Sequence, residues 1–374
     1  MIKMTFCIIT HVLHKECERK YYAYGPYVRE MNLWIKNVDN VIIVAPIDYT
    51  IKPDLIDIPY NHNQITFLRI PRFDVLSFKS ILKTIYLLPK IIIQIYKGML
   101  KADHIHLRCP GNVGLIGCFL QILFPSKKKT AKYASNWDWN IKQPWSYRLQ
   151  QRILRNTFLT RNMTALVYGD WPDRTKNIKP FFTASYSEKE RLSVKKAPLS
   201  DGLKLAFIGT LTENKSPLTS LEVLKSLSEK GVMSTLTLCG DGPQRAILEQ
   251  KISEYGVGSI VKILGNVGAE RVKEVLKASH FLVFISRSEA WGKATSEAMW
   301  WGCVPITTPV SCVPWMLGNG SRGELITGVV NEIVHLLEAY ISDPSKFDEK
   351  SIKAMEWARQ YTLEKFEKEI KNLI

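Results

Sequence analysis

Short apolar, β-rich segments alternate with helix-length segments along nearly the whole chain of 374 residues, and they form two successive series. Strands that alternate with helices imply βαβ units and a parallel sheet with helices on both faces. The strand-like segments of the first series include TFCIITHV, NVIIVAP, QITFLRIP, DHIHLRCP, TAKYAS and ALVYGD, and those of the second include KLAFIGTL, MSTLTLCGDG, SIVKILGNV, HFLVFISR and CVPITTP. The sequence therefore predicts an α/β fold with two Rossmann-like domains in tandem.

A charged segment without apolar periodicity separates the two series. Residues 188–202 contain Pro198 and Gly202 and are typical of a linker between domains. We therefore expect an N-terminal domain over residues 1–187 and a C-terminal domain over 203–350. Residues 351–374 are amphipathic, and we expect a C-terminal helix that packs back across the domain junction.

Positive charge is concentrated in the first half of the chain. Residues 1–187 hold 27 Lys and Arg against 12 Asp and Glu, so this half carries +15 of the net charge of +16. Such an excess favours an anionic partner, either a nucleic acid or an anionic membrane surface. Residues 77–100 combine lysines with many aliphatic residues, which is typical of a membrane-surface helix or of a helix packed on a sheet; for the segment IIIQIY we expect burial.

Three loops of the predicted second domain follow strand ends, where ligands bind in open α/β sheets. Gly209 permits close approach of the backbone, and Lys215 can reach a phosphate from the start of the next helix. Gly292 lets N–H groups face an anion, a helix that opens near Thr295 adds its dipole, and Lys293 adds a full charge. These features predict a site for a phosphorylated ligand.

Two glutamates flank this glycine and lysine. Glu289 lies in the loop and Glu297 on the first turn of the predicted helix, so they can bind opposite ends of one ligand. A carboxylate that accepts hydrogen bonds from two vicinal hydroxyls can hold a ribose, and Glu297 is placed for this beside the helix start. The alternative is that both acids merely complement the helix dipole.

The second half resembles the retaining glycosyltransferases of family 4, which have the GT-B fold. The family's hallmark is matched by Glu289, seven intervening residues, Glu297, Ala298-Met299, Gly302 and Pro305. Four further blocks follow the family's order, namely LAFIGTLTENKS, LTLCGDGPQRAILE, VKILGNV and ASHFLVFISRSEAWGK. Weaker similarity at YGPYVREMNLWIK, DHIHLRCPGN and KYASNWDW points to a subgroup of bacterial surface-polysaccharide synthesis. The resemblance implies a cleft between the two domains.

The resemblance also implies roles for the predicted site. Glu297 would bind the donor ribose, Glu289 the hydroxyls of the transferred sugar, and the backbone at Gly265 the base. The departing diphosphate would be stabilised electrostatically by Lys215, Lys293 and the backbone from Gly292 to Ala294. Retention in this family is usually explained by a front-face mechanism in which the leaving phosphate deprotonates the acceptor, so no protein nucleophile is expected.

Two positions depart from the family pattern. The arginine that usually follows the first glycine is Thr210 here, and Lys293 is a candidate to supply the missing charge. The histidine usual in a first-domain loop is absent from the matching segment, YASN. Candidate residues on the acceptor side are therefore His106, Arg108, Asn136 and Trp137. Hydrogen-bonded structural roles for the histidine and arginine, and a core position for the tryptophan, are the alternatives.

Together these features predict a retaining glycosyltransferase that uses a UDP- or GDP-sugar and a lipid-linked or saccharide acceptor in capsule, O-antigen or exopolysaccharide synthesis. The chain has no Asp-x-Asp pair, so we expect activity without a metal or other cofactor. Its seven cysteines form no C-x-x-C pair, which favours the cytoplasm. Together with the basic first half, this predicts a location at the inner face of the plasma membrane. The alternatives are a nucleotide-sugar 2-epimerase and a catalytically silent subunit. A nucleic-acid-binding protein ranks last, because no recognisable motif accompanies the charge.

Overall fold

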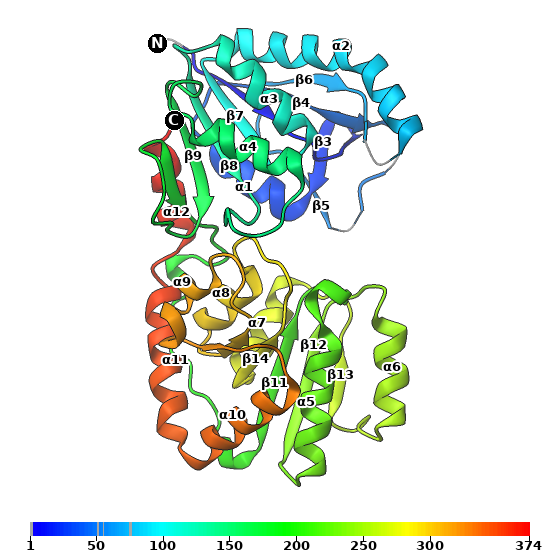
Figure 1. Ribbon diagram of the computed structural model, residues 1–374, viewed down its shortest axis with the longest axis vertical. Coiled ribbons are helices and arrows are strands. Elements are labelled where there is room, and N and C mark those ends of the chain that lie inside the picture. The colour runs from blue at the N-terminus through cyan, green and yellow to red at the C-terminus, as the bar shows by residue number, and fades with distance from the viewer. Residues whose placement is uncertain (1–2, 51, 55, 75–76) are drawn as a thin grey trace. The chain divides into compact units, whose positions relative to one another are not determined.

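The computed structural model describes residues 3–50, 52–54, 56–74 and 77–374 (Figure 1). The chain divides into two compact units, Met1–Phe181 with Phe366–Ile374 and, in between, Phe182–Lys365. Each unit is built around its own largely parallel sheet. The α/β architecture predicted from the alternation of strands and helices is therefore confirmed.

The sheet of the first unit has the strand order β10-β9-β8-β7-β1-β4, with β6 paired to the other edge of β4, and all of these pairs are parallel. The sequence did not predict a small extension in which β2 pairs with β4 in parallel and β3 and β5 follow through antiparallel pairs. The strands are β1 (Thr5–Ile9), β2 (His14–Cys17), β3 (Lys20–Tyr24), β4 (Asn40–Asp48), β5 (Asp57–Pro59), β6 (Ile65–Ile70), β7 (His104–Cys109), β8 (Lys128–Tyr133), β9 (Met163–Tyr168) and β10 (Ile178–Phe181).

Side chains alternate between the two faces of this sheet. Cys7, Ile105 and Ala131 face a core that also holds Ile91 and Ile95 of α2. Their neighbours along the strands face the other way, where Phe6 and His106 pack against Trp34 of α1. The helices of the unit are α1 (Gly25–Ile35), α2 (Phe78–Lys101), α3 (Asn112–Leu120), α4 (Trp145–Arg155) and the last turns of α12 (Leu363–Lys371). None of the described helices is long and apolar enough to cross a membrane.

The second unit has a six-stranded parallel sheet in the order β13-β12-β11-β14-β15-β16. Because β11 and β14 are neighbours although two strands separate them in the sequence, the connections leave in opposite directions between them. The strands are β11 (Leu203–Ile208), β12 (Ser234–Cys239), β13 (Val261–Ile263), β14 (Phe281–Phe284), β15 (Val304–Thr307) and β16 (Glu324–Leu325). The helices are α5 (Pro217–Glu229), α6 (Arg245–Glu254), α7 (Ala269–Ala278), α8 (Lys293–Trp300), α9 (Val313–Met316), α10 (Val330–Ser342) and α11 (Pro344–Ala358).

The division of the chain differs from the predicted one. The boundary lies after Phe181, and residues 188–202 pack on the second unit instead of linking two domains. Lys196 shows why, because its Nζ donates to the carbonyls of Leu276, Lys277 and Ser279 at 2.7–3.0 Å, at the end of α7. The predicted single helix over 351–374 is interrupted between α11 and α12, and Phe366–Ile374 belongs to the first unit.

Candidate functional site

The point in the second unit where β11 and β14 lie side by side is a topological switch point, and open α/β sheets bind ligands at the carboxyl ends of the strands there. The loop that follows β11 carries Gly209, Thr210 and Lys215, and the loop that follows β14 carries Glu289 and Gly292. The sheet therefore brings together two segments that are far apart in the sequence, with Lys215 and Glu289 separated by 74 positions.

Lys215 and Glu289 form an ion pair across these two loops, with 2.5 Å between Nζ and Oε1. The lysine ammonium also lies 3.4 Å from the carbonyl oxygen of Ser288 and 3.5 Å from Oγ of Ser286. The two side chains are 21% and 10% exposed, so both charges are mostly shielded but still reachable from solvent. A partly desolvated charge pair is worth more to a bound anion or hydroxyl than a fully solvated one.

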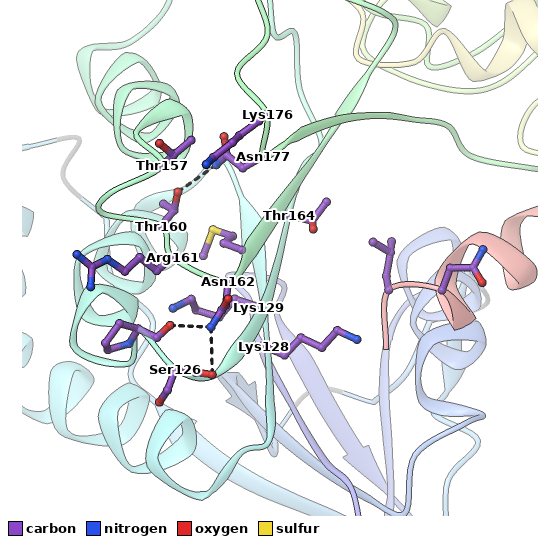
Figure 2. A pocket seen from close by; sticks show the side chains of 14 residues that line it. Ser126, Lys128, Lys129, Thr157, Thr160, Arg161, Asn162, Thr164, Lys176 and Asn177 are labelled. Atoms are coloured by element: carbon purple, nitrogen blue, oxygen red, sulfur yellow. Dashed lines mark hydrogen bonds between the residues drawn. The ribbon is translucent and has the colours of Figure 1, made fainter.

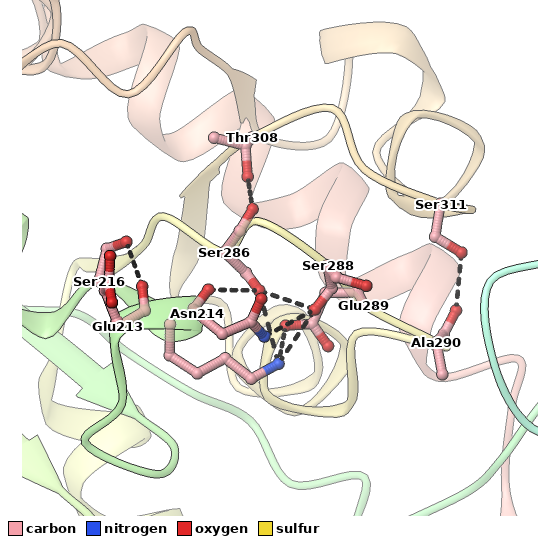
Figure 3. Close-up of polar contacts among 10 residues, drawn as sticks. Glu213, Asn214, Ser216, Ser286, Ser288, Glu289, Ala290, Thr308 and Ser311 are labelled. Atoms are coloured by element: carbon pink, nitrogen blue, oxygen red, sulfur yellow. Dashed lines mark hydrogen bonds and ion pairs between the residues drawn. The ribbon is translucent and has the colours of Figure 1, made fainter. Parts of the chain in front are cut away.

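Hydrogen bonds between the two loops hold Glu289 in place (Figure 3). The side-chain amide of Asn214 donates to the carbonyl of Ser288 at 3.3 Å, and the N–H of Arg287 donates to the carbonyl of Asn214 at 2.8 Å. From the loop that follows β15, the hydroxyl of Thr308 donates to the carbonyl of Ser286. A loop fixed at three points loses little entropy when a ligand binds, which favours binding.

Helix α8 begins directly after this loop, and its N-terminus carries no side-chain cap. Gly292 precedes it in the left-handed conformation at φ +74°, which glycine adopts without strain. The helix therefore starts at Lys293, two residues before the predicted start near Thr295. The N–H groups from Lys293 through Ala294 to Thr295 point out of the first turn, where the helix dipole favours an anion.

Glu297 lies on the second turn of α8, one turn later than predicted, because the helix starts earlier. Its Oε1 accepts a hydrogen bond from the hydroxyl of Ser185 at 2.7 Å and lies 3.6 Å from Nζ of Lys293. The glutamate is 15% exposed, whereas the lysine is 46% exposed. Sequence reasoning missed Ser185, because the contact joins residues 112 positions apart and no local pattern marks it.

Three glycines bring the loops after β11, β12 and β13 into backbone contact. A Cβ on Gly240 would lie 1.8 Å from the carbonyl oxygen of Gly209, and the N–H of Gly240 donates to the carbonyl of Gly265 at 2.8 Å. Thr210, next to Gly209, is exposed. The predicted donor residues Gly209, Thr210 and Gly265 are thus placed at one edge of the sheet.

We expect Gly240→Ala to lower the free energy of unfolding of the second unit by about 3 kcal/mol or more, because the methyl group would overlap a backbone oxygen. Gly256→Ala is the matched control. Gly256 also has a positive φ, +66°, but nothing lies within 4 Å of its Cβ position, so we expect a loss of about 1 kcal/mol. Urea unfolding of both variants measures the difference, and equal losses would contradict the close contact.

The predicted acceptor-side residues of the first unit do not form a site. His106 lies in the middle of β7, is fully buried, and its Nδ1 is 2.9 Å from the hydroxyl of Thr130. Trp137 is part of the core, and the buried Asn136 accepts the N–H of Asp138 at 2.9 Å. These three predictions are wrong, because the pairing of β7 and the fold of the 134–140 loop turn the side chains inward.

Arg108, the fourth predicted acceptor-side residue, is partly exposed but forms a buried ion pair. Its guanidinium lies 3.5 Å from Oε1 of Glu30, which is also 2.9 Å from Nζ of the buried Lys132. Burial alone would raise the pKa of Glu30, but Lys132 and Arg108 outweigh it and lower this pKa. The side chain of Arg108 is 16% exposed and is committed to this buried charge cluster, which makes it a structural residue.

A cavity of about 280 Å³ at the carboxyl ends of β1, β4, β6 and β7 is the better acceptor-side candidate in the first unit. His11, Arg72, Asn112 and Tyr147 bring polar groups to it. Burial and the nearby charge of Arg108 lower the pKa of His11, so its ring is neutral at neutral pH and can accept a proton. The signal that sequence reasoning missed is position, because His11 lies in the loop at the carboxyl end of β1.

A wider groove of about 1060 Å³ lies at the opposite edge of the same sheet, at the amino ends of β8 and β9 (Figure 2). Lys128, Lys129, Arg161 and Lys176 line it, and its described lining residues include no Asp or Glu. It contains none of the predicted site residues. Among the described residues, no three His, Cys, Asp or Glu side chains are grouped so that they could hold a metal ion.

A known protein family matches the second unit, which contains the candidate site. Residues 188–357 match the family model described as Glycosyl transferases group 1. This part of the chain is a glycosyl transferases group 1 domain. The match confirms the domain family that was inferred from the paired glutamates and their neighbouring blocks.

Curated relatives match the chain over less than half of their own length. The GPI3 subunit of phosphatidylinositol N-acetylglucosaminyltransferase from Saccharomyces cerevisiae (strain YJM789) is 24% identical over 173 residues, which cover 44% of this chain and 38% of the relative. The 2-deoxystreptamine glucosyltransferase of Streptomyces kanamyceticus is 26% identical over 176 residues, which cover 46% and 44%.

Solved structures resemble this chain over nearly its whole length. Anabaena HepE, solved in complex with UDP, has a TM-score of 0.68 at 14% identity and covers 99% of both chains. WaaG, a glycosyltransferase involved in lipopolysaccharide biosynthesis, has a TM-score of 0.63 at 14% identity with the same coverage. At such low identity these likenesses show the fold, and the predicted GT-B architecture of two Rossmann-like domains is confirmed.

Proposed function

We propose that this protein is a retaining glycosyltransferase that moves a sugar from a nucleotide-sugar to a lipid-linked or saccharide acceptor in surface-polysaccharide synthesis. The observation that carries the proposal is the Lys215–Glu289 pair at the switch point of a glycosyl transferases group 1 domain. The uncapped N-terminus of α8, at Lys293, follows Glu289 closely in the chain and supplies further donors for an anion. A nucleoside diphosphate fits this combination of cation, carboxylate and free N–H groups.

The chemistry follows from the charges. As the bond between the anomeric carbon and the phosphate oxygen breaks, negative charge grows on the diphosphate, and Lys215, Lys293 and the N–H groups of α8 stabilise it. Glu289 accepts hydrogen bonds from the sugar and Glu297 from the ribose. The acceptor oxygen bonds to the anomeric carbon on the same face, and its proton passes to the leaving phosphate oxygen. These cationic groups make a metal ion unnecessary for the step.

The donor and the location are part of the same proposal. We infer a UDP-sugar, since HepE, with the same fold, was solved with UDP and with UDP-glucose. The basic first unit favours an anionic membrane surface, which supports a location at the inner face of the plasma membrane. A lipid-linked acceptor fits that location.

Titration with UDP, GDP and ADP in EDTA by calorimetry tests the donor site. We expect UDP to bind with a micromolar dissociation constant, and Glu297→Ala to weaken binding about tenfold or more, because a hydrogen-bonded carboxylate is lost. Glu356→Ala, which removes an exposed carboxylate of the same unit, is the control and should bind UDP like the wild type.

Each outcome separates one part of the proposal from the others. Binding of UDP without hydrolysis or transfer would favour a catalytically silent subunit, and conversion of a UDP-sugar to its 2-epimer would favour an isomerase. Binding that requires Mg²⁺ would overturn metal independence. Absence of binding by all three nucleotides would overturn the donor site built on Glu297.

A further inference from the structure

The outward face of α2 in the first unit is apolar. Exposed apolar side chains recur at spacings of three and four residues, so they form one stripe along the helix. They are between 39% and 84% exposed, and they are Ile81, Leu82, Ile85, Tyr86, Ile93, Tyr96 and Leu100. The opposite face, with Ile91, Ile95 and Met99, is fully buried on the sheet. The helix is therefore apolar on both sides, which is unusual for a helix that covers a sheet.

The apolar stripe continues beyond α2. Phe119 of α3 is 49% exposed and Leu123, just after it, is 63% exposed. Tyr96 packs its ring 5.3 Å from that of Phe124, and Nζ of Lys127 donates to the last carbonyls of α2. These contacts fix the segment 119–127 beside the end of α2, so the exposed apolar residues form one surface.

The lysines of α2 indicate which kind of partner covers this apolar surface. Residues 78–101 contain five lysines, at 79, 83, 90, 97 and 101, and no Asp or Glu. None of these lysines forms an ion pair with a carboxylate in the part of the chain that the structure describes. A protein partner of ordinary composition would leave five like charges unmatched, whereas a bilayer with anionic lipids provides an apolar layer and negative headgroups together.

We propose that the first unit docks on an anionic lipid bilayer through the outward face of α2, which lies along the membrane surface with its apolar stripe inserted. This inference rests on the proposed function. Phe73 lines the 280 Å³ cavity, and Asp74, which follows it, is tied to α2 because its carbonyl accepts a hydrogen bond from the hydroxyl of Thr84 at 2.8 Å. Docking through α2 therefore brings the candidate acceptor cavity close to the headgroups, where a lipid-linked acceptor carries its sugar.

Flotation with lipid vesicles tests the proposal. The wild type should bind phosphatidylcholine vesicles that contain about 30% phosphatidylglycerol and should bind pure phosphatidylcholine weakly. Leu82→Glu combined with Ile93→Glu should weaken vesicle binding about tenfold or more, because both carboxylates would lie in the inserted stripe and face anionic lipid. Lys83→Gln with Lys90→Gln and Lys97→Gln should weaken it similarly and reduce its dependence on salt.

Matched controls distinguish a lost membrane surface from a lost donor site and from a misfolded variant. Leu192→Glu and Met233→Glu replace exposed apolar residues of the second unit and should bind vesicles like the wild type. Calorimetry with UDP should give the wild-type dissociation constant for every variant, so a failed donor site and a failed membrane surface are distinguished. Unchanged unfolding midpoints show that the α2 variants fold.

Two results would overturn the proposal. The first is undiminished vesicle binding by the α2 variants together with its loss in Arg161→Glu combined with Lys176→Glu, which would assign the lipid contact to the basic groove of Figure 2. The second is an absence of vesicle binding by the wild type, and self-association in sedimentation velocity would then assign the apolar stripe to a second copy of the chain.

Discussion

Lys215→Met is expected to lower kcat for donor hydrolysis or transfer about 10²–10³-fold, while the dissociation constant for UDP rises about tenfold. The lysine is held in place before any ligand binds, by Glu289 at 2.5 Å and by Ser286 and Ser288. A preorganised charge is worth more in the transition state, when the diphosphate gains negative charge, than in the ground state. The split between kcat and Kd is therefore the signature of this role.

Glu289→Gln adds a second test to the same pair. Because the two side chains contact each other, their substitutions should not be additive, and the double variant should lose less activity than the product of the single losses. Removing the lysine alone also leaves a carboxylate that is 10% exposed without its cation, so Lys215→Met should be less stable than the double variant.

Steady-state kinetics with UDP-glucose, UDP-N-acetylglucosamine and GDP-mannose, together with UDP calorimetry, measure these effects. Lys225→Met is the control, because Lys225 lies in the same unit and its partner, Glu229, is exposed. A loss confined to UDP affinity, with kcat unchanged, would show that Lys215 binds the diphosphate equally in both states. No loss at all would exclude the lysine from the site.

The donor loops could be predicted from sequence because their signals are local. Glycines, prolines and apolar runs mark the strand ends, and parallel strands necessarily present these ends at one edge. Trp300 at the end of α8 and Trp301, its C-cap, are both buried. What the sequence could not supply was the exact start of α8, which depends on the left-handed conformation of Gly292.

The acceptor-side residues were harder to predict, because the direction of their side chains depends on how β7 pairs with its neighbouring strands. His106 and Arg108 lie near a proline, as residues at a strand end do, but β7 extends to Cys109 and its alternation turns His106 into the layer beneath α1. Ser185 reaches Glu297 only through the packing of the segment after Phe181 on the second unit. Such contacts between distant residues have no periodicity that a single sequence would show.

Acidification from pH 7.5 to pH 5 is expected to destabilise the first unit far more than the second. Burial lowers the pKa of His14 to about 4 and that of His104 to about 3, and it also lowers the pKa of His106. The second unit has one comparable residue, His280, whose pKa burial lowers to about 4. All four side chains are fully buried.

The sign follows from proton binding. An unfolded histidine, with a pKa of about 6.5, takes up a proton below that pH, whereas the folded one stays neutral until about pH 4, so stability falls as the pH drops through 6.5. At pH 5, His14 and His104 each contribute a loss of about 2 kcal/mol in the first unit, to which His106 adds, whereas His280 contributes about 2 kcal/mol in the second. The corresponding falls in Tm are more than about 10 °C for the first unit and roughly 5 °C for the second.

Differential scanning calorimetry at the two pH values should therefore resolve two transitions that move apart as the pH falls. His104→Gln with His106→Gln should reduce the pH-dependent loss of the first unit by more than about 2 kcal/mol, whatever its own effect on stability at pH 7.5. His335→Gln, at an exposed position of the second unit, is the control and should leave both transition temperatures as in the wild type. Equal shifts of both transitions would contradict the unequal burial of histidine, because each unit would then take up the same number of protons on unfolding.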